Sequence, residues 1–390
     1  MSAFITTQVL DEAARREAFP VCREQIFMGH AGVTVLPRVV ADAMIGYIRR
    51  SCEQHQEFGE VLADINRARK VSAEFIGAGA DEIALLGPTS LGLSLFANGL
   101  PWKDGDELLC YADDYPANVY PWMELTRRGV TVRYLQPERP GELTPALVEA
   151  ALTERTRLVA LASCNFLTGY KIDVDAIGRL LRKRGVLFSL DAIQTLGAAP
   201  LSVEHVDFLS ADAHKWMLGP MAIGIVFVRR EHFDLLRPTL LGAWNVRSPN
   251  FITQPQIDFH ATAQRYEPGV LNVAGVYGMR AALDLIADAG IERVNERILS
   301  LKRALTEPLL AAGFEFLGPL DGPAASGITT FRHPARDSAA LFRALEQHKI
   351  VASLRFDRAG LQYIRLSPHF YNTLDEVARV VEIVTGTWGN

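Results

Sequence analysis

Cysteine is scarce in this chain. Its 390 residues include four cysteines, and none of them stands in a Cys-x-x-Cys pair or in another spacing typical of zinc ligands. We therefore expect neither a disulfide framework nor a metal site. So few cysteines in a long chain are typical of proteins that work in a reducing cytosol, which predicts a cytoplasmic protein.

Long hydrophobic runs and a strong charge of one sign are also missing. No apolar run reaches the length of a membrane-spanning helix, and the opening MSAFITTQVLDEAARREAF lacks the basic start and apolar core of a secretory signal. The formal net charge of −5 gives no electrostatic attraction to nucleic acid or to an anionic membrane. We therefore expect a small molecule as the ligand, and neither nucleic acid nor a membrane as a partner.

The glycine-rich fingerprint of dinucleotide-binding enzymes is absent as well. No Gly-x-Gly-x-x-Gly sequence follows any of the expected strands. That loop is what lets a backbone approach a pyrophosphate. An NAD-dependent oxidoreductase, the alternative that an α/β pattern raises, therefore gains no support.

The composition that is present is that of an ordinary globular protein, with 49% hydrophobic and 22% charged residues. Strands alternate with helices across residues 26–228, which predicts an α/β fold with a mainly parallel sheet covered by helices on both faces. The remaining helices and strands predict a smaller α+β C-terminal domain. We place the large domain at residues 26–265 and the small domain at residues 1–25 with 266–390.

Two of the expected strands end in polar side chains. One apolar run ends at Asp191, with Gln194 three residues later, and a second apolar run leads to His214 and Lys215. Sheets of this class bind their ligands at the carboxyl ends of their strands. We therefore expect these side chains to lie close together at one edge of the sheet.

This set of residues suits an aldehyde cofactor. A lysine at a strand end can form a Schiff base with pyridoxal phosphate, because a desolvated amine readily loses its proton. A carboxylate beneath the ring keeps the pyridine nitrogen protonated, so that the ring draws electrons from the substrate. We assign Lys215 and Asp191 to these roles, with Gln194 near the phenolic oxygen. Taken singly, an aspartate at a strand end is more often a turn-former and a lysine a solvated charge.

The sequences DAIQ at 191–194 and DAHKWMLGP at 212–220 resemble the Asp-x-x-Gln and His-Lys motifs of a known family. This family comprises the pyridoxal-phosphate enzymes of the class V aminotransferase and cysteine desulfurase group, including selenocysteine lyases, C–S lyases and isopenicillin N epimerases. The resemblance implies the type I aminotransferase fold, a seven-stranded sheet, an aldimine at Lys215, and a homodimer with its active sites at the subunit interface.

The resemblance also implies further cofactor contacts. Thr89 and Ser90 open an expected helix, where free N–H groups favour a phosphate, although both residues are also common helix caps. His214 adds a third phosphate contact. Tyr115 stands where the family places an aromatic ring that stacks on the pyridine, and its alternative role is to fill a loop. Asn165 matches an asparagine close to the phenolic oxygen.

On the substrate side, the resemblance gives Arg365 the role of binding the α-carboxylate, which suits its bidentate donors. His30 and Ala31 lie in a turn that approaches the substrate in the family. A capping or loop role for His30 is about equally consistent with the sequence.

Two residues depart from the family pattern. Val270 stands where a threonine reaches the phosphate of the neighbouring subunit's cofactor, so that hydroxyl contact is lost. Asp212 stands where a serine or threonine usually binds the phosphate, and a carboxylate would be repelled there. We therefore expect Asp212 to point elsewhere or to pair with an arginine.

The cofactor residues do not separate β-elimination from transamination or epimerisation. Cysteine desulfurases carry a mobile cysteine just before the last arginine motif, but residues 352–358 contain none, and no cysteine follows Cys164. We therefore predict a lyase of the C–S or C–Se type that acts on an amino acid without a persulfide cysteine. An aminotransferase and an amino-acid epimerase are the alternatives, and a non-catalytic protein that binds pyridoxal phosphate is a further one.

Overall fold

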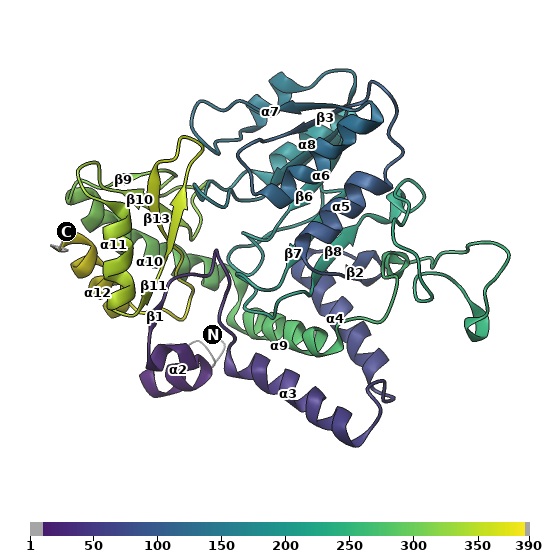
Figure 1. Cartoon of the computed structure of the whole chain (residues 1–390), viewed down its shortest axis with the longest axis horizontal. Coiled ribbons are helices and arrows are strands. Elements are labelled where there is room, and N and C mark those ends of the chain that lie inside the picture. Colours follow the sequence, from purple (N-terminus) through teal and green to yellow (C-terminus); the bar gives the residue numbers. More distant parts are fainter. Residues whose placement is uncertain (1–10, 387–390) are drawn as a thin grey trace.

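The computed structural model describes residues 11–386, which form two units built on separate sheets (Figure 1). The sequence up to about residue 19 has a helix-like pattern, and its first ten residues lie outside the described residues. The larger unit contains a seven-stranded sheet with the order β2-β8-β7-β6-β5-β3-β4. Its strands are β2 (Ile83–Leu85), β3 (Glu107–Cys110), β4 (Thr131–Tyr134), β5 (Thr156–Ala162), β6 (Leu187–Asp191), β7 (Phe208–Asp212) and β8 (Gly224–Val228).

The large sheet is mainly parallel, as predicted. Only β8 breaks the pattern, because it runs antiparallel to both β7 and β2. The central strands are apolar and buried on both faces, which is typical of parallel sheets that carry helices on each side. Strands β5, β6 and β7 therefore end at the same edge of the sheet. Asp191 is the last residue of β6, and Asp212 is the last residue of β7.

Helices cover both faces of the large sheet. One face packs against α4 (Val61–Ile76), α8 (Val174–Arg184) and α9 (Val273–Ala289). The other face packs against α5 (Thr89–Gly99) and the short helix α6 (Tyr120–Met123). This three-layer arrangement confirms the predicted α/β class with helices on both faces.

The smaller unit is built on a four-stranded antiparallel sheet with the order β12-β13-β10-β9. Its strands are β9 (Glu315–Phe316), β10 (Thr329–Arg332), β12 (Ser353–Phe356) and β13 (Gln362–Leu366). The core of this unit is closed by the helices α10 (Ile291–Ala311), α11 (Ser338–Gln347) and α12 (Leu374–Thr385). A separate parallel pair joins β1 (Ile26–Phe27) to β11 (Ile350–Val351), so N-terminal residues complete this unit.

Two predicted elements are divided in the structure. The helical pattern across residues 37–76 forms two helices, α3 (Arg38–Glu53) and α4, because the chain turns back so that the buried Phe58 packs against Tyr47. The sequence pattern at residues 350–354 predicts a single strand, but the structure divides it at residue 352, since β11 pairs with β1 whereas β12 pairs with β13.

The domain boundary at residue 265 remains a prediction. Helix α9 follows that boundary in the sequence, yet its Val276, Met279 and Leu283 lie in the core beneath the large sheet. The neighbouring α10 packs with the small unit. The sequence pattern predicts helices across residues 272–312, and in the structure these helices contribute to different cores.

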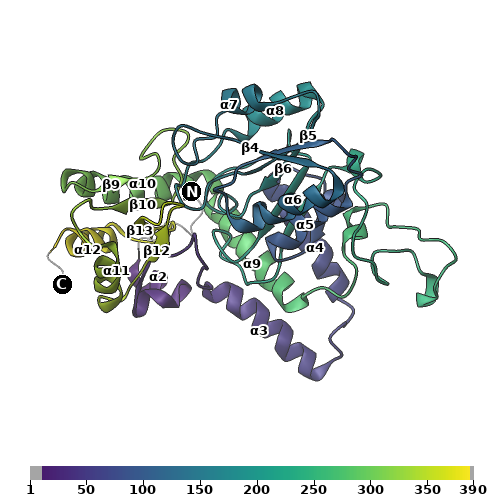
Figure 2. The same cartoon turned by 45° about the horizontal axis from the view of Figure 1, so that its top comes forward.

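A long irregular segment covers residues 238–272, which agrees with the lack of sequence periodicity from residue 241 to residue 268. It contains only two short 3₁₀ turns, Pro249–Phe251 and Ala263–Tyr266. Figure 2 shows it as a green loop that extends from the large unit, on the side away from the small unit. Its Phe251 is 78% exposed and its Ile257 is 57% exposed.

None of the helices within residues 11–386 is both long enough and apolar enough to span a bilayer.

Candidate active site

A cavity of about 320 Å³ opens at the carboxyl edge of the large sheet, where the hairpin of β12 and β13 from the small unit faces it. Residues from both units line it. The predicted site residues among them are Ala31, Thr89, Ser90, Tyr115, Asp191, Gln194, His214, Lys215 and Arg365. The fold thus brings together side chains that lie far apart in the sequence.

Lys215 follows β7 and is 7% exposed. Burial lowers its pKa to about 8, the negative charge of Asp191 opposes this shift, and the positive charges of Arg365 and Arg355 add to it. Its Nζ atom lies 5.2 Å from the centre of the Tyr115 ring, which gives the amine an aromatic wall. Near neutral pH the amine of such a lysine is therefore neutral and nucleophilic far more often than the amine of an ordinary lysine.

Asp191 is the last residue of β6 and is 3% exposed. Burial raises its pKa, while a hydrogen bond of 3.0 Å from the N–H of Ile193 and the charge of Lys215 oppose the shift. A buried carboxylate favours a cationic partner, since ionisation without one is costly. This side chain is therefore suited to hold a protonated ring nitrogen.

Gln194 is fixed by two hydrogen bonds. Its Nε2 donates to the carbonyl oxygen of Ala31 at 3.1 Å, and its Oε1 accepts from Nε1 of Trp216 at 2.9 Å. These bonds tie the turn at Ala31 to the segment that carries Lys215. The amide nitrogen keeps a second hydrogen that can be donated into the cavity.

The N-terminus of α5 forms the opposite end of the cavity. No side chain caps this helix, so its first N–H groups are free to bind an anion beside Ser90. Thr89 Oγ1 accepts a hydrogen bond of 2.8 Å from the backbone N–H of Asp212. Gly92 allows the helix to lie close to the sheet, because a Cβ atom there would be 2.4 Å from Oγ of Ser210.

Asp212 is 1% exposed and does not line the cavity. Its Oδ1 lies 3.1 Å from Nδ1 of His214, within the range of an ion pair, although the atoms are not aligned for a hydrogen bond. The sequence predicts a side chain that points elsewhere or pairs with an arginine, and its partner is a histidine. The two residues both belong to the segment that leads from β7 to Lys215, which explains their closeness.

Arg365 lies on β13 and is 1% exposed. Its Nη1 donates to the carbonyl oxygen of Phe166 at 2.6 Å, whereas its Nε and Nη2 have no partner among the described residues. Burial lowers the pKa of this guanidinium, and the nearby charge of Arg355 lowers it further. Free donors on a buried cation suit a carboxylate ligand.

Two residues singled out in the sequence do not line the cavity. His30 is fully buried, with Nδ1 2.9 Å from the carbonyl oxygen of Ser367 and Nε2 2.9 Å from Oη of Tyr371. Asn165 stabilises its own loop, because its Oδ1 accepts from the N–H of Thr168 at 2.9 Å. The alternative interpretation of His30 as a loop histidine agrees with these contacts.

Arg355 and Phe166 also line the cavity, although no motif in the sequence points to either. The Phe166 ring meets the Tyr115 ring edge to face, with 5.4 Å between the ring centres. A signal for Arg355 is its place in the segment 352–358, where cysteine desulfurases carry their mobile cysteine. Its direction into the cavity depends on how β12 pairs with β13, which the sequence did not reveal.

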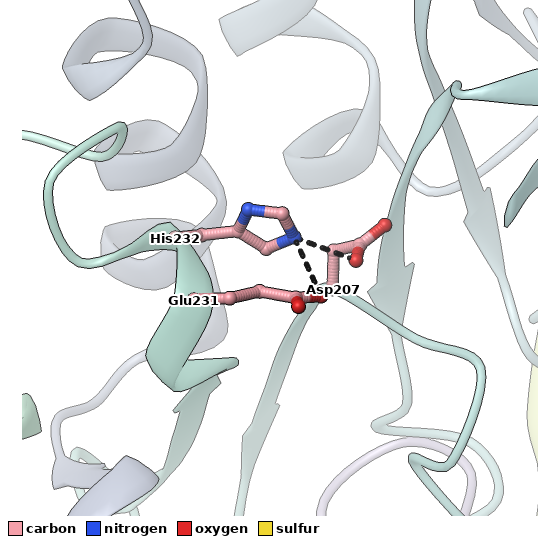
Figure 3. Close-up of side chains that lie close together, drawn as sticks. All are labelled: Asp207, Glu231 and His232. Carbon is pink, nitrogen blue, oxygen red and sulfur yellow. Dashed lines mark hydrogen bonds and ion pairs between the residues drawn. The ribbon is translucent and has the colours of Figure 1, made fainter.

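A second polar cluster lies at the amino end of β7, far along the strand from Lys215. Figure 3 shows that His232 points toward Asp207, with Glu231 beside it. The Nε2 atom of His232 lies 2.8 Å from Oδ1 of Asp207, whose other oxygen accepts the N–H of Phe188. These contacts give the cluster a structural role in fixing the start of the strand.

Comparisons with known proteins agree with this geometry. A model of the family described as Aminotransferase class-V matches residues 26–380. A probable cysteine desulfurase of Pyrococcus abyssi is 27% identical over 386 residues, which cover 93% of this chain and 94% of that protein. The apo structure of a cysteine desulfurase from Thermococcus onnurineus NA1 has a TM-score of 0.88 and 25% identity, covering 96% of this chain and 97% of the other.

The fold is also shared with the cystine C–S lyase C-DES, solved in complex with cysteine persulfide, at a TM-score of 0.85 and 20% identity over 95% of this chain and 100% of that one. The cavity residues fit pyridoxal phosphate: a buried amine, a buried carboxylate, an uncapped helix N-terminus and an aromatic face surround one space. The chain therefore belongs to the class V aminotransferase family and is a pyridoxal-phosphate-dependent enzyme of the cysteine desulfurase-like group.

Proposed function

We propose that the protein is a lyase that breaks the bond between Cβ of an amino acid and a sulfur or selenium atom, without a cysteine that carries the released atom. The proposal depends on one observation, a cavity with Lys215, Asp191 and Arg365 that none of the four cysteines lines. Cys164 is buried, and burial raises the pKa of its thiol to about 11, so it remains protonated.

Each residue has one task in this proposal. Bound pyridoxal phosphate supplies a sink for the electrons released at Cα. Asp191 keeps the proton on the ring nitrogen, and Tyr115 covers the ring face. Arg365 orients the α-carboxylate through its unpartnered Nε and Nη2. The amine of Lys215 is suited to take the proton from Cα, because its pKa of about 8 lies near the operating pH.

Thr89, Ser90 and His214 bind the cofactor phosphate in this proposal. The uncapped start of α5 provides N–H groups and the positive end of the helix dipole. His214 lines the cavity beside this helix, and its Nδ1 lies 3.1 Å from Oδ1 of Asp212.

The proton, the electron pair and the leaving group of this elimination are all accounted for. Lys215 receives the Cα proton, the bond from Cβ to sulfur breaks, and the sulfur leaves with the electron pair as a thiolate. The remaining 2-aminoacrylate reacts with water to give pyruvate and ammonium. The thiolate takes a proton from Lys215 or from solvent, so no external oxidant or reductant is needed.

We further propose that the protein acts in the cytoplasm as a homodimer, with the loop of residues 238–272 at the interface. Large hydrophobic side chains on this loop are exposed in the single chain, which is typical of interface residues. They are Leu240, Leu241, Phe251, Ile252, Ile257 and Val270.

The reaction is tested by incubating the cofactor-loaded enzyme with S-substituted cysteines and measuring all products. Elimination predicts pyruvate, ammonium and free thiol in equal amounts. Alanine with protein-bound sulfur would instead identify a desulfurase, pyridoxamine phosphate with a keto-acid product an aminotransferase, and loss of optical activity without new products an epimerase. Each of these three results contradicts the proposal, as does a complete lack of turnover.

A further inference from the structure

Two arginines point into the cavity from the same face of one hairpin. Arg355 lies opposite Tyr363, and Arg365 lies opposite Ser353, so the arginines are diagonal neighbours on β12 and β13. Both line the cavity. Their Nη2 atoms approach the same point, because a Cβ atom built on Gly32 would lie 3.9 Å from Nη2 of Arg355 and 3.7 Å from Nη2 of Arg365.

Neither arginine has an anionic partner within the described chain. Arg365 makes a single hydrogen bond, to a backbone carbonyl, and it is 1% exposed. Arg355 makes no hydrogen bond or ion pair with residues 11–386, and its Nε is buried without a partner. Two neighbouring cations with unsatisfied donors oppose folding. An anionic ligand would compensate for both charges.

Nearby arginines of the small unit are neutralised by carboxylates. Arg358, three residues after Arg355, pairs with Asp113, and Arg332 on β10 pairs with Glu315 at 2.8 Å. Of the three arginines on the strands of this sheet, the two that line the cavity are therefore the ones without a carboxylate partner among the described residues. The acids closest to the cavity have other partners, since Asp191 faces Lys215 and Asp212 faces His214.

One carboxylate does not account for both guanidinium groups. The planar fork of a single arginine binds a carboxylate with two parallel hydrogen bonds. Arg365 retains enough free donors for the α-carboxylate, which leaves Arg355 for another anion. The phosphate end of the cavity is formed by α5 and His214, whereas Arg355 belongs to the end near Gly32 and Arg365.

We propose that the substrate is an amino acid whose side chain ends in an anionic group, and that Arg355 binds this group while Arg365 binds the α-carboxylate. The inference rests on the proposed elimination, which makes the substrate a cysteine whose sulfur carries a carboxylate-bearing substituent. Arg355 then acts as a specificity-determining residue. It is partly exposed, which places the substituent toward the opening of the cavity.

The test uses two isosteric substrates, S-carboxymethylcysteine and its neutral amide, S-carbamoylmethylcysteine. The wild-type holoenzyme should prefer the carboxylate by about tenfold or more in kcat/KM, the scale of one charge-assisted contact. In Arg355→Gln the two substrates should have about the same kcat/KM, because only turnover of the carboxylate falls and the amide is still turned over at nearly the wild-type rate. Arg365→Gln should impair both substrates.

A matched control is Arg358→Gln, which removes the next arginine of the same hairpin and should leave the preference unchanged. Equal weakening of both substrates in Arg355→Gln would mean that both arginines bind one carboxylate, and would overturn the proposal. Circular dichroism and the midpoint of thermal unfolding establish that each variant is folded.

Binding measurements separate this inference from the reaction itself. Calorimetry with succinate and its monoamide, neither of which can react, should show tighter binding of succinate to the wild-type holoenzyme and loss of that difference in Arg355→Gln. If this difference is present but no S-substituted cysteine is turned over, the elimination is wrong and the acidic ligand class stands. If succinate and the monoamide bind alike, the inference about Arg355 is wrong.

Discussion

Lys215 combines two properties that a buried amine needs in this chemistry. Burial lowers its pKa to about 8, and Asp191 limits that shift. The neutral amine is the form that attacks an aldehyde. The neutral fraction of the Lys215 amine rises with pH and levels off once the pH exceeds the pKa. The pKa of Lys215 therefore sets the pH range in which the apoenzyme can capture its cofactor.

The expected outcome is that covalent capture of pyridoxal phosphate by the apoenzyme rises with pH and reaches half of its maximal rate at about pH 8. Below that midpoint the rate should fall roughly tenfold per pH unit, as for a single protonation. Stopping the reaction with borohydride and locating the added mass on the peptide that contains Lys215 measures this rate.

Lys302 provides an internal control within the same experiment. Burial lowers its pKa to about 8 as well, but its Nζ donates to the carbonyl oxygens of Ser326 and Ile328 and lies in the small unit. It should remain unlabelled. Equal labelling of both lysines, or a midpoint near the ordinary lysine value, would contradict a selective role for the cavity.

At the scale of an element, α5 determines the geometry of the phosphate end. The helix lies so close to β7 and β8 that a Cβ atom at Gly92 would be 2.4 Å from Oγ of Ser210 and 2.8 Å from Cγ2 of Val226. A side chain there must push the helix away from the sheet. The hydrogen bond between Asp212 and Thr89 would lengthen with it.

Gly92→Ala should therefore destabilise the protein by about 1–3 kcal/mol through overpacking. It should also weaken binding of pyridoxal phosphate, measured by titrating the apoenzyme and following cofactor fluorescence. Gly46→Ala is the matched control, since Gly46 is also helical and a Cβ there would meet nothing within 4 Å. Because alanine favours a helix by about 1 kcal/mol at either position, a loss of stability confined to Gly92→Ala isolates the contact with the sheet.

At the scale of the whole molecule, the loop of residues 238–272 has an exposed middle, residues 249–258, whereas Asn245, Ala263 and Glu267 nearer its ends are buried. Figure 1 shows it extending away from the body of the large unit. Val270 is 73% exposed at its end, although the neighbouring Tyr266 is buried. A loop with large exposed hydrophobic residues is best explained by a second copy of the chain.

The wild-type protein should sediment at twice the mass of one chain. Replacing both Phe251 and Ile257 with serine should shift the protein toward the monomer, because it removes apolar area from the proposed interface. Leu310→Ser, on the exposed surface of α10, is the control and should leave the assembly unchanged. A wild-type monomer would contradict the proposed homodimer.

The sequence alone was sufficient to predict the chemistry of the site and the class of the fold. Polar residues directly after apolar strands identify Lys215 and Asp191, since strand ends in a parallel sheet meet at one edge. Local pattern also predicted the strands and the irregular segment near residue 250. It did not predict the division of the helical stretch 37–76, because the contact between Phe58 and Tyr47 that reverses the chain is tertiary.

Only the tertiary structure decided which of the remaining candidates line the cavity. His30 and Asn165 match the family in sequence, but the structure has them bonded to their own surroundings. Arg355 carries no motif, and strand pairing in the small unit turns it into the cavity. The physical reason is that a residue's chemistry is fixed by its side chain, whereas its direction and its partners are set by contacts between segments far apart in the chain.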